Sequence, residues 1–89
     1  MAYASMNLSA LGYANGFTLW HYRTADLAGD IDTSGYFRPA SDMLRVGDFI
    51  FVNAGLGSAP VHGVVVVVSN DNGNVDVANI SAFATVNSD

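Results

Sequence analysis

Large apolar residues recur in several short runs of the chain, separated by Gly, Pro, Asn, Asp and Ser, which is the pattern of β-strands. Residues 17–23 (FTLWHYR), 49–53 (FIFVN), 61–69 (VHGVVVVVS) and 75–80 (VDVANI) each predict a strand. The first run places large groups on both of its faces, so we expect both faces to be covered. Residues 81–86 alternate loosely and are expected to extend the sheet.

Residues 64–68 are five consecutive valines, a run that has no solvent face. One face of an antiparallel sheet is normally in contact with water. The run therefore indicates either a closed barrel with an outer cover or a contact between subunits. Asn72-Gly73 follows it and supplies the positive φ values of a two-residue hairpin turn.

The segment between the first two predicted strands indicates short helices. Its signals are an N-cap hydroxyl, a first-turn carboxylate, two apolar residues four apart and a glycine for the left-handed end, namely Thr24, Asp26, Leu27, Ile31 and Gly35. They predict a helix of about two turns that lies on the sheet, because so short a helix is not stable alone. Residues 39–44 (PASDML) predict a second helical turn, and residues 46–48 a turn into the next strand.

Residues 1–16 (MAYASMNLSALGYANG) are small, weakly polar and aperiodic, and their glycines and Asn15 interrupt any helix. We interpret them as an extended N-terminal arm, with a frayed terminus as the alternative. The arm carries apolar side chains suited to docking on a neighbouring subunit or shell, namely Tyr3, Met6, Leu8, Leu11 and Tyr13. Residues 17–89 then form a single, mainly β domain, predicted to be a small antiparallel β-barrel or sandwich with one short helix.

The composition favours an oligomer. The chain has 89 residues, so the core that it can bury is small, and it has no Cys to reinforce that core with a disulfide. Only 12% of the residues are charged, and Lys, Glu and Gln are absent. Lys and Glu are depleted at protein interfaces. We therefore expect much of the surface to lie against protein, with biased residue usage in an unusual host as the alternative; the candidate oligomer interface consists of Trp20, Tyr22, Val64, Val66 and Val68.

Charge and hydropathy argue against two classes of partner. The net charge is −5 and the only three basic residues, all Arg, are dispersed, whereas binding to nucleic acid needs clustered Lys and Arg. The first residues lack the basic and apolar regions of a signal peptide. No apolar run approaches the ~20 residues of a membrane-spanning helix. We expect neither nucleic acid nor a membrane as a partner.

Two oxygen-rich clusters are candidate metal sites. Residues 30–35 (DIDTSG) match the first half of a calcium-binding loop. The second half fails, because Ser41 stands where a bidentate Glu is required, and a helix end explains Gly35 without a metal. Residues 71–76 (DNGNVD) are explained by turn chemistry. We therefore expect no metal and no cofactor.

No complete catalytic set is present. The serines lie outside any G-x-S-x-G elbow, and although Asp30 and Asp32 are paired carboxylates, so small a domain is not expected to hold a sizeable pocket. His21 and His62 lie in apolar strands and are interpreted as hydrogen-bonded residues of the core or an interface, with a pH-sensitive interface as the alternative. We expect that the protein is not an enzyme.

One spacing resembles a known family. The pattern W-x-Y-x-T-x-D…GYF-x-x-A…L-x-x-GD-x-I covers about a third of the chain. It is similar to a short module of the small capsid-decorating proteins, of the cement or head-fibre-base type, of tailed bacteriophages and gene transfer agents. The matching positions are Trp20, Tyr22, Thr24, Asp26, Gly35, Tyr36, Phe37, Ala40, Leu44, Gly47, Asp48 and Ile50.

The resemblance implies a virion protein that sits on the capsid surface, commonly as a trimer at three-fold positions, with the major capsid protein as its partner. It implies no reaction and no cofactor. Within the matched pattern, the structural motif consists of Thr24, Asp26, Gly35, Tyr36, Phe37, Gly47 and Asp48. The alternative function is a head-fibre, spike or tail-associated module that recognises host surface glycan by stacking on Trp20, Tyr22 and Tyr36, although such aromatic sets more often belong to a core.

Overall fold

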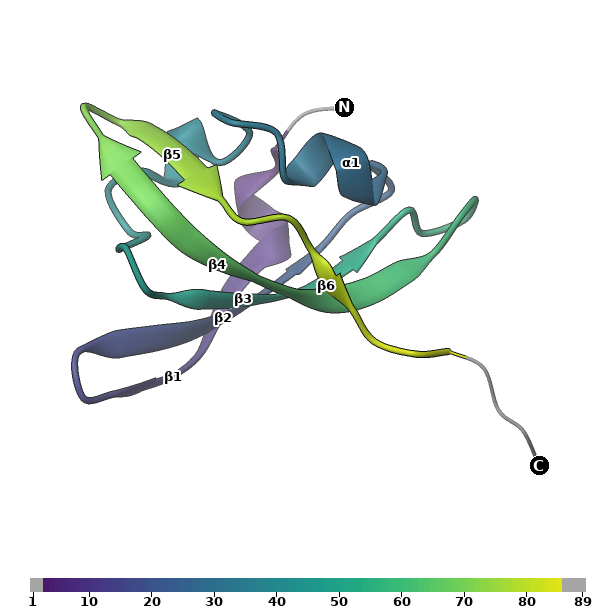
Figure 1. The fold of residues 1–89 in the computed structure, drawn as a ribbon, viewed down its shortest axis with the longest axis horizontal. Coiled ribbons are helices and arrows are strands. Elements are labelled where there is room, and N and C mark those ends of the chain that lie inside the picture. The colour runs from purple at the N-terminus through teal and green to yellow at the C-terminus, as the bar shows by residue number, and fades with distance from the viewer. Residues whose placement is uncertain (1–2, 86–89) are drawn as a thin grey trace.

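The chain folds around one six-stranded sheet, with short helices packed on one of its faces (Figure 1). A computed structural model describes residues 3–85. The strands are β1 (Leu8–Ala14), β2 (Phe17–Arg23), β3 (Phe49–Ala54), β4 (Val61–Asp71), β5 (Asn74–Val77) and β6 (Ser81–Ala82). The helical elements are η1 (Ser5–Asn7), α1 (Ala28–Ile31) and η2 (Arg38–Ala40), of which η1 and η2 are 3₁₀ turns. The prediction of a mainly β domain with one short helix is confirmed.

The sheet is mixed and open. The strand order is β1-β2-β3-β4-β5, and β6 also pairs with β4. β2 and β3 run parallel, whereas the other paired strands are antiparallel. A parallel pair needs a crossover connection, and residues 24–48 supply it together with the helical cover of one sheet face. The sheet is therefore not closed into a barrel, and β1 lies at its free edge.

The core lies between the sheet and this crossover. Alternate residues of each strand point to one face, and the inward ones are buried, as the pattern along β3 shows for Ile50 and Val52. The crossover adds Ile31, Phe37 and Leu44, each at most 1% exposed. The largest fully buried side chains are Tyr22, Phe37, Ile31, Leu44, Ile50, Val52, Val65, Val67, Val75 and Asp48.

The valine run has two different faces. Val65 and Val67 point into the core and are 2% and 1% exposed, whereas Val64 and Val66 are half-buried and Val68 is 49% exposed. The expectation that the run lacks a solvent face is therefore wrong at Val68. The cause is the open sheet, whose second face is not covered by any element of the described chain.

Both Asn-Gly pairs form hairpin turns with positive φ at both residues. At Asn72-Gly73 the φ values are 54° and 82°, which confirms the predicted turn, and at Asn15-Gly16 they are 54° and 85°. The interpretation of residues 1–16 as an extended arm is therefore wrong for β1, which pairs with β2 through a bulge near Ala10 and Gly12. Residues 1 and 2 of the predicted arm lie outside the described residues.

The crossover is less helical than expected. α1 begins at Ala28, and Thr24 does not cap it; its Oγ1 accepts a hydrogen bond from the Asp26 N–H at 3.0 Å. Gly35 has φ +88°, as the helix-ending role predicts, and Leu44 is buried. At the other end of the chain β6 spans only two residues, and Val86 of the predicted strand lies outside the described residues.

Candidate functional site

A buried carboxylate anchors β2, the second strand of the β1–β2 hairpin. Asp48 is fully buried, and its two oxygens accept hydrogen bonds from the Thr18 N–H at 3.0 Å, the Trp20 Nε1–H at 3.1 Å and the Arg45 N–H at 3.1 Å. A buried carboxylate needs such donors to offset its loss of hydration. Asp48, which directly precedes β3, thereby ties β2 to the end of the crossover.

Gly47 shapes the same region. Its φ is +97°, and a Cβ at this position would lie 2.6 Å from Cε1 of the Phe17 ring. The left-handed backbone conformation favours glycine, and a Cβ here would also displace the half-exposed Phe17 ring. The Gly47-Asp48 pair of the motif therefore sets where the first residues of β2 leave the body of the domain.

A second group of motif residues forms a hydrogen-bonded chain. The Tyr36 hydroxyl donates to Oδ2 of Asp26 at 2.6 Å, so Tyr22, whose hydroxyl lies 2.9 Å from that of Tyr36, donates to Tyr36. The Tyr22 hydroxyl in turn accepts the Ala4 N–H at 3.0 Å. Tyr3 stacks on Tyr22 with ring centroids 5.6 Å apart, and Phe37 packs edge-on against Tyr22 at 5.2 Å. These contacts hold residues 3 and 4 on the crossover.

The hydrogen bonds between Tyr22, Tyr36 and Asp26 shift the pKa values of Tyr36 and Asp26 in opposite directions. Burial, followed by the hydrogen bond to Asp26, raises the pKa of the Tyr36 hydroxyl far above its ordinary value. The hydrogen bond from Tyr36 lowers the pKa of the Asp26 carboxyl. A tyrosine that stays protonated and a carboxylate that stays ionised form a structural pair, because neither exchanges its proton near neutral pH.

These packing contacts change two expectations about the aromatic residues. Tyr22 is 0% exposed within its own chain, so its assignment to an oligomer interface is wrong. Trp20 is half-buried, and its Nε1–H is already bonded to Asp48. The proposed glycan platform of Trp20, Tyr22 and Tyr36 belongs to the core cluster and its immediate margin. The alternation in β2 did not reveal this, because both of its faces carry large residues.

The predicted anchors of the arm divide into two groups. Tyr3 and Leu8 pack against the core of their own chain. Met6, Leu11 and Tyr13 remain 87%, 59% and 68% exposed. Only the second group is free to contact another molecule.

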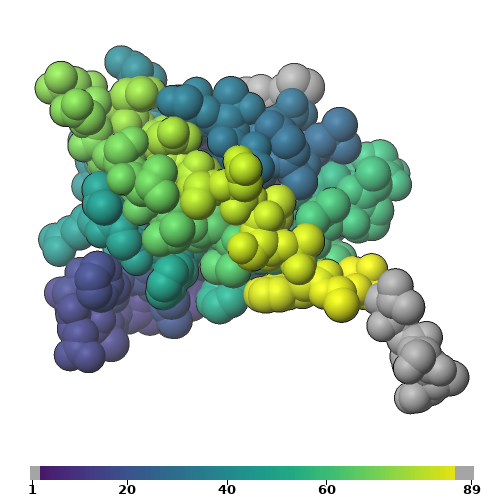
Figure 2. All heavy atoms as spheres, in the orientation of Figure 1, coloured from purple at the N-terminus to yellow at the C-terminus, as the bar shows by residue number. Residues whose placement is uncertain are grey.

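A larger exposed apolar surface lies on the uncovered side of the sheet. The registers place Leu19 of β2 beside Phe49 of β3, and Phe49 beside Val66 of β4, all on the face opposite the core. Phe17, Leu19 and Phe49 are 51%, 40% and 46% exposed. The hairpin adds Tyr13 at its tip, and Figure 2 shows the dark-blue hairpin as a lobe that projects from the body. We call this surface the hairpin face; it consists of Gly12, Tyr13, Ala14, Phe17, Leu19 and Phe49.

The hairpin face contains a hollow. A groove of about 430 Å³ is lined by all six of its residues. Phe17 and Leu19 lie on β2, Phe49 on β3, and the other three residues on β1. Sequence reasoning missed this site. Its signal in the sequence is the alternation of large apolar residues along two strands, at Phe17 and Leu19 and at Phe49 and Phe51, which places them on one face of the sheet.

Carboxylates are absent from the strands that carry this face. β1, β2 and β3 contain no Asp, and the only Asp in β4 is its last residue, Asp71. Four acidic residues lie in the crossover instead, at Asp26, Asp30, Asp32 and Asp42, besides the buried Asp48. Within residues 3–85, no carboxylate therefore belongs to the residues that form the hairpin face.

Two histidines border the same face of the sheet. Asn53 of β3 lies between His21 of β2 and His62 of β4. Its Oδ1 lies 2.5 Å from the His62 Nδ1, and its Nδ2 lies 2.8 Å from the His21 Nε2. An Nδ1–H on His62 and an unprotonated Nε2 on His21 satisfy both bonds. The predicted hydrogen-bonded role of the histidines is met by this cross-strand ladder.

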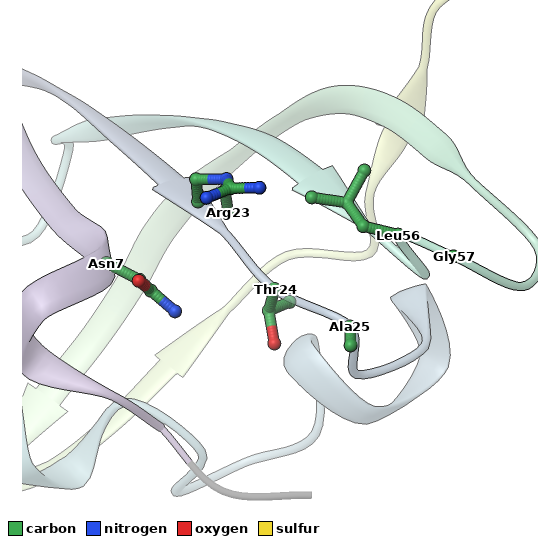
Figure 3. A pocket seen from close by; sticks show the side chains of 6 residues that line it. All are labelled: Asn7, Arg23, Thr24, Ala25, Leu56 and Gly57. Carbon is green, nitrogen blue, oxygen red and sulfur yellow. The ribbon is translucent and has the colours of Figure 1, made fainter.

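A second hollow, of about 400 Å³, lies at the other end of β2 (Figure 3). Asn7 and Leu56 lie on opposite sides of it, with Arg23 between them, and Thr24, Ala25 and Gly57 complete its lining. The lining contains no carboxylate, His or Cys, so it offers no general base beside a nucleophile. Its one cation, Arg23, is exposed at the mouth.

The calcium-like segment does not form a converging set of ligands. Asp30 accepts the Leu27 N–H at 3.3 Å, and Asp32 accepts the Ile80 N–H at 3.4 Å. Within residues 3–85, no three or more His, Cys, Asp or Glu side chains are grouped so that they could hold a metal ion. No helix in this part of the chain is long and apolar enough to cross a bilayer.

The site is therefore best described as an apolar, carboxylate-free binding surface held in place by a buried scaffold. Trp20, Gly47 and Asp48 position the hairpin, while Tyr22, Asp26 and Tyr36 bind residues 3 and 4 to the crossover. No protein-family model, curated protein or solved structure matches the chain.

Proposed function

We propose that this protein is a virion structural protein that binds the outer surface of a phage capsid as an oligomer and stabilises the shell. The observation that carries the proposal is the hairpin face, on which Tyr13, Phe17 and Phe49 remain about half exposed or more. Exposed apolar side chains gathered in one patch are typical of surfaces that bind other proteins. The W-x-Y…GYF…GD resemblance indicates that the protein's neighbours are copies of itself and the major capsid protein.

The mechanism follows from linked binding. A protein that binds only the assembled shell stabilises that shell by mass action. An oligomer attaches through several copies at once, which raises its effective affinity by ~10²–10⁴ without new contacts. The major capsid protein as partner and a trimeric form follow from the resemblance alone, and the hairpin face does not carry the trimeric form.

The exposed anchors near the N-terminus supply a second contact. Met6 is 87% exposed and Leu11 59%, on η1 and β1 respectively. Their neighbours Tyr3 and Leu8 are held against the core, so these two side chains are presented by an ordered backbone. Pre-ordered anchors lose little conformational entropy when they bind. We assign Met6 and Leu11 to the contact with the shell.

The test uses undecorated capsids of the tailed phage whose genome encodes this chain. Purified protein is mixed with the capsids, pelleted with them, and the shells are then heated. We expect saturable attachment and a higher disruption temperature for decorated shells. Met6→Ser should weaken attachment, whereas Met43→Ser, which changes a 45% exposed methionine on the crossover side, should not. Absence of attachment, or attachment without any gain in shell stability, would remove the proposed function.

A further inference from the structure

We propose that the hairpin face binds the hairpin face of a second copy of this chain, so that two hairpins pack against each other across a two-fold axis. The inference rests on the proposed function only for where the association takes place, namely on a capsid. The contact itself involves only copies of this chain. It differs from the expected interface in its residues, because Tyr22 is buried and none of Val64, Val66 and Val68 lines the groove.

The first argument is shape. The groove of about 430 Å³ lies among the same residues that project from the surface, with Tyr13 68% and Phe17 51% exposed beside it. A two-fold contact places the same patch on both partners, so the patch must contain both the projecting group and the hollow that receives it. The hairpin face meets this requirement, since one copy's aromatic rings can enter the other copy's groove.

The second argument is charge. Two copies that each carry a net charge of −5 repel one another over most of their surfaces. The strands β1, β2 and β3 carry no Asp, and the acidic residues of the crossover lie on the covered side of the sheet. Approach through the hairpin face therefore keeps most carboxylates of the two copies apart. An anionic lipid surface is disfavoured, because β1 has no basic residue and β2 has only Arg23, at the end away from the hairpin turn.

The third argument is the free edge. β1 pairs with β2 on one side only, so its remaining backbone N–H and C=O groups face outward. Such an edge binds another strand unless charges, Pro or a bulge prevent it. β1 has a bulge near Ala10 and Gly12 but no charged residue and no Pro. Beyond the bulge, the edge is open beside the groove at Tyr13 and Ala14.

The test is sedimentation equilibrium of the full chain and of two matched variants. Leu19→Ser changes a leucine on the hairpin face that is 40% exposed, and Leu27→Ser changes one beside α1 that is 49% exposed. We expect the native chain and Leu27→Ser to associate reversibly with the same constant. We expect Leu19→Ser to associate at least about tenfold more weakly, as for an interface centre, while its circular dichroism stays that of the folded chain.

A second variant guards against loss of folding. Tyr13→Asp places a carboxylate on a side chain that is 68% exposed, so it leaves the core intact while two copies would bring like charges together. We expect this variant to be folded and to stay monomeric at low salt. At high salt, which screens the repulsion between the two carboxylates, it should associate more strongly. Equal association of native chain, Leu19→Ser and Tyr13→Asp would overturn the inference, and so would a native chain that is monomeric at all concentrations.

The two proposals fail separately. A chain that associates through the hairpin face but does not attach to capsids contradicts the proposed function and leaves this inference standing. A chain that attaches to capsids as a monomer contradicts this inference and leaves attachment standing.

Discussion

The two Asn-Gly hairpins have the same turn and opposite surroundings. The turn residues have φ values of 54° and 85° in the β1–β2 hairpin, and 54° and 82° in the β4–β5 hairpin. Yet Val75 and Val77 of β5 are 1% and 4% exposed, whereas every residue of β1 after Leu8 is exposed. Turn chemistry is therefore set locally, but what a hairpin does depends on whether the rest of the fold covers it.

The difference arises from the crossover. Residues 24–48 cover the inner face of the sheet, including β5, whose Val75 C=O accepts the Gly35 N–H at 2.9 Å. The tip of the β1–β2 hairpin extends beyond this cover. On the inner side, β2 is held close to the turn, where Asp48 accepts hydrogen bonds from Thr18 and Trp20 and Gly47 approaches Phe17. One hairpin is thus part of the core, and the other leaves apolar side chains exposed on the surface.

The largest expected effect separates the two faces of β4. Val67→Asp places a charge at a position that is 1% exposed and should destabilise the fold by more than about 4 kcal/mol, since nothing there pairs with it. Val68→Asp, at a 49% exposed neighbour, should change the free energy of unfolding by less than about 1 kcal/mol. Urea unfolding followed by circular dichroism measures both, and equal losses would show that the two faces of β4 are not distinct.

The next effect tests the anchor of the hairpin. Asp48→Ala leaves the N–H groups of Thr18, Trp20 and Arg45 without their acceptor and should cost about 3 kcal/mol. Asp42→Ala, which removes an exposed carboxylate of the same crossover, is the control and should cost less than about 0.5 kcal/mol. If thermal unfolding gave the two variants the same midpoint, Asp48 would not anchor the hairpin.

A smaller effect compares the turns themselves. Gly73→Ala forces an L side chain to φ near +82° and should cost about 1–2 kcal/mol in global unfolding. Gly16→Ala meets the same backbone penalty with open space around its Cβ, but its hairpin can open locally. We expect a global loss of less than about 0.5 kcal/mol there, with faster amide exchange confined to β1 and the start of β2. Equal global losses would show that both hairpins belong to one cooperative unit.

The smallest effect concerns pH. The pKa of Asp26 is lowered in the folded chain, chiefly by the Tyr36 hydrogen bond, so this group contributes stability above the ordinary carboxyl range of about pH 4. That contribution is lost as the pH falls through the lowered folded-state pKa. Asp26→Asn, and likewise Tyr36→Phe, should flatten the acid limb of the stability profile, measured as the unfolding midpoint from pH 6 to acid pH. An acid limb as steep as that of the native chain would contradict this role of the pair.

Sequence patterns predicted the strands best where one face is buried. β2 has the predicted bounds of 17–23, and β3 and β4 begin at the predicted Phe49 and Val61. The sequence pattern does not predict β1, because its side chains are small or unpatterned. Asn15-Gly16 indicates a helix breaker there, whereas Asn72-Gly73, which lies between two clear strand patterns, predicts a turn. The parallel pairing of β2 with β3 was also missed, since it depends on how residues 24–48 cross the sheet.

The binding surface was harder to predict than the core. Whether Tyr22 or Phe49 faces a partner depends on which side of the sheet the crossover covers, and neighbouring residues alone do not determine that. Several motif positions, by contrast, are hydrogen-bonded to one another, as Trp20 is to Asp48 and Tyr36 to Asp26. Their spacing therefore reflects a scaffold for the hairpin and the crossover.

Amide hydrogen exchange of the native chain at two protein concentrations tests the central claim most directly. The account predicts slow exchange in residues 61–77 at both concentrations. It predicts fast exchange in residues 8–19 when the protein is dilute and slow exchange when it is concentrated, because a second copy then covers that hairpin. Exchange in residues 8–19 that is equally fast, or equally slow, at both concentrations would contradict it.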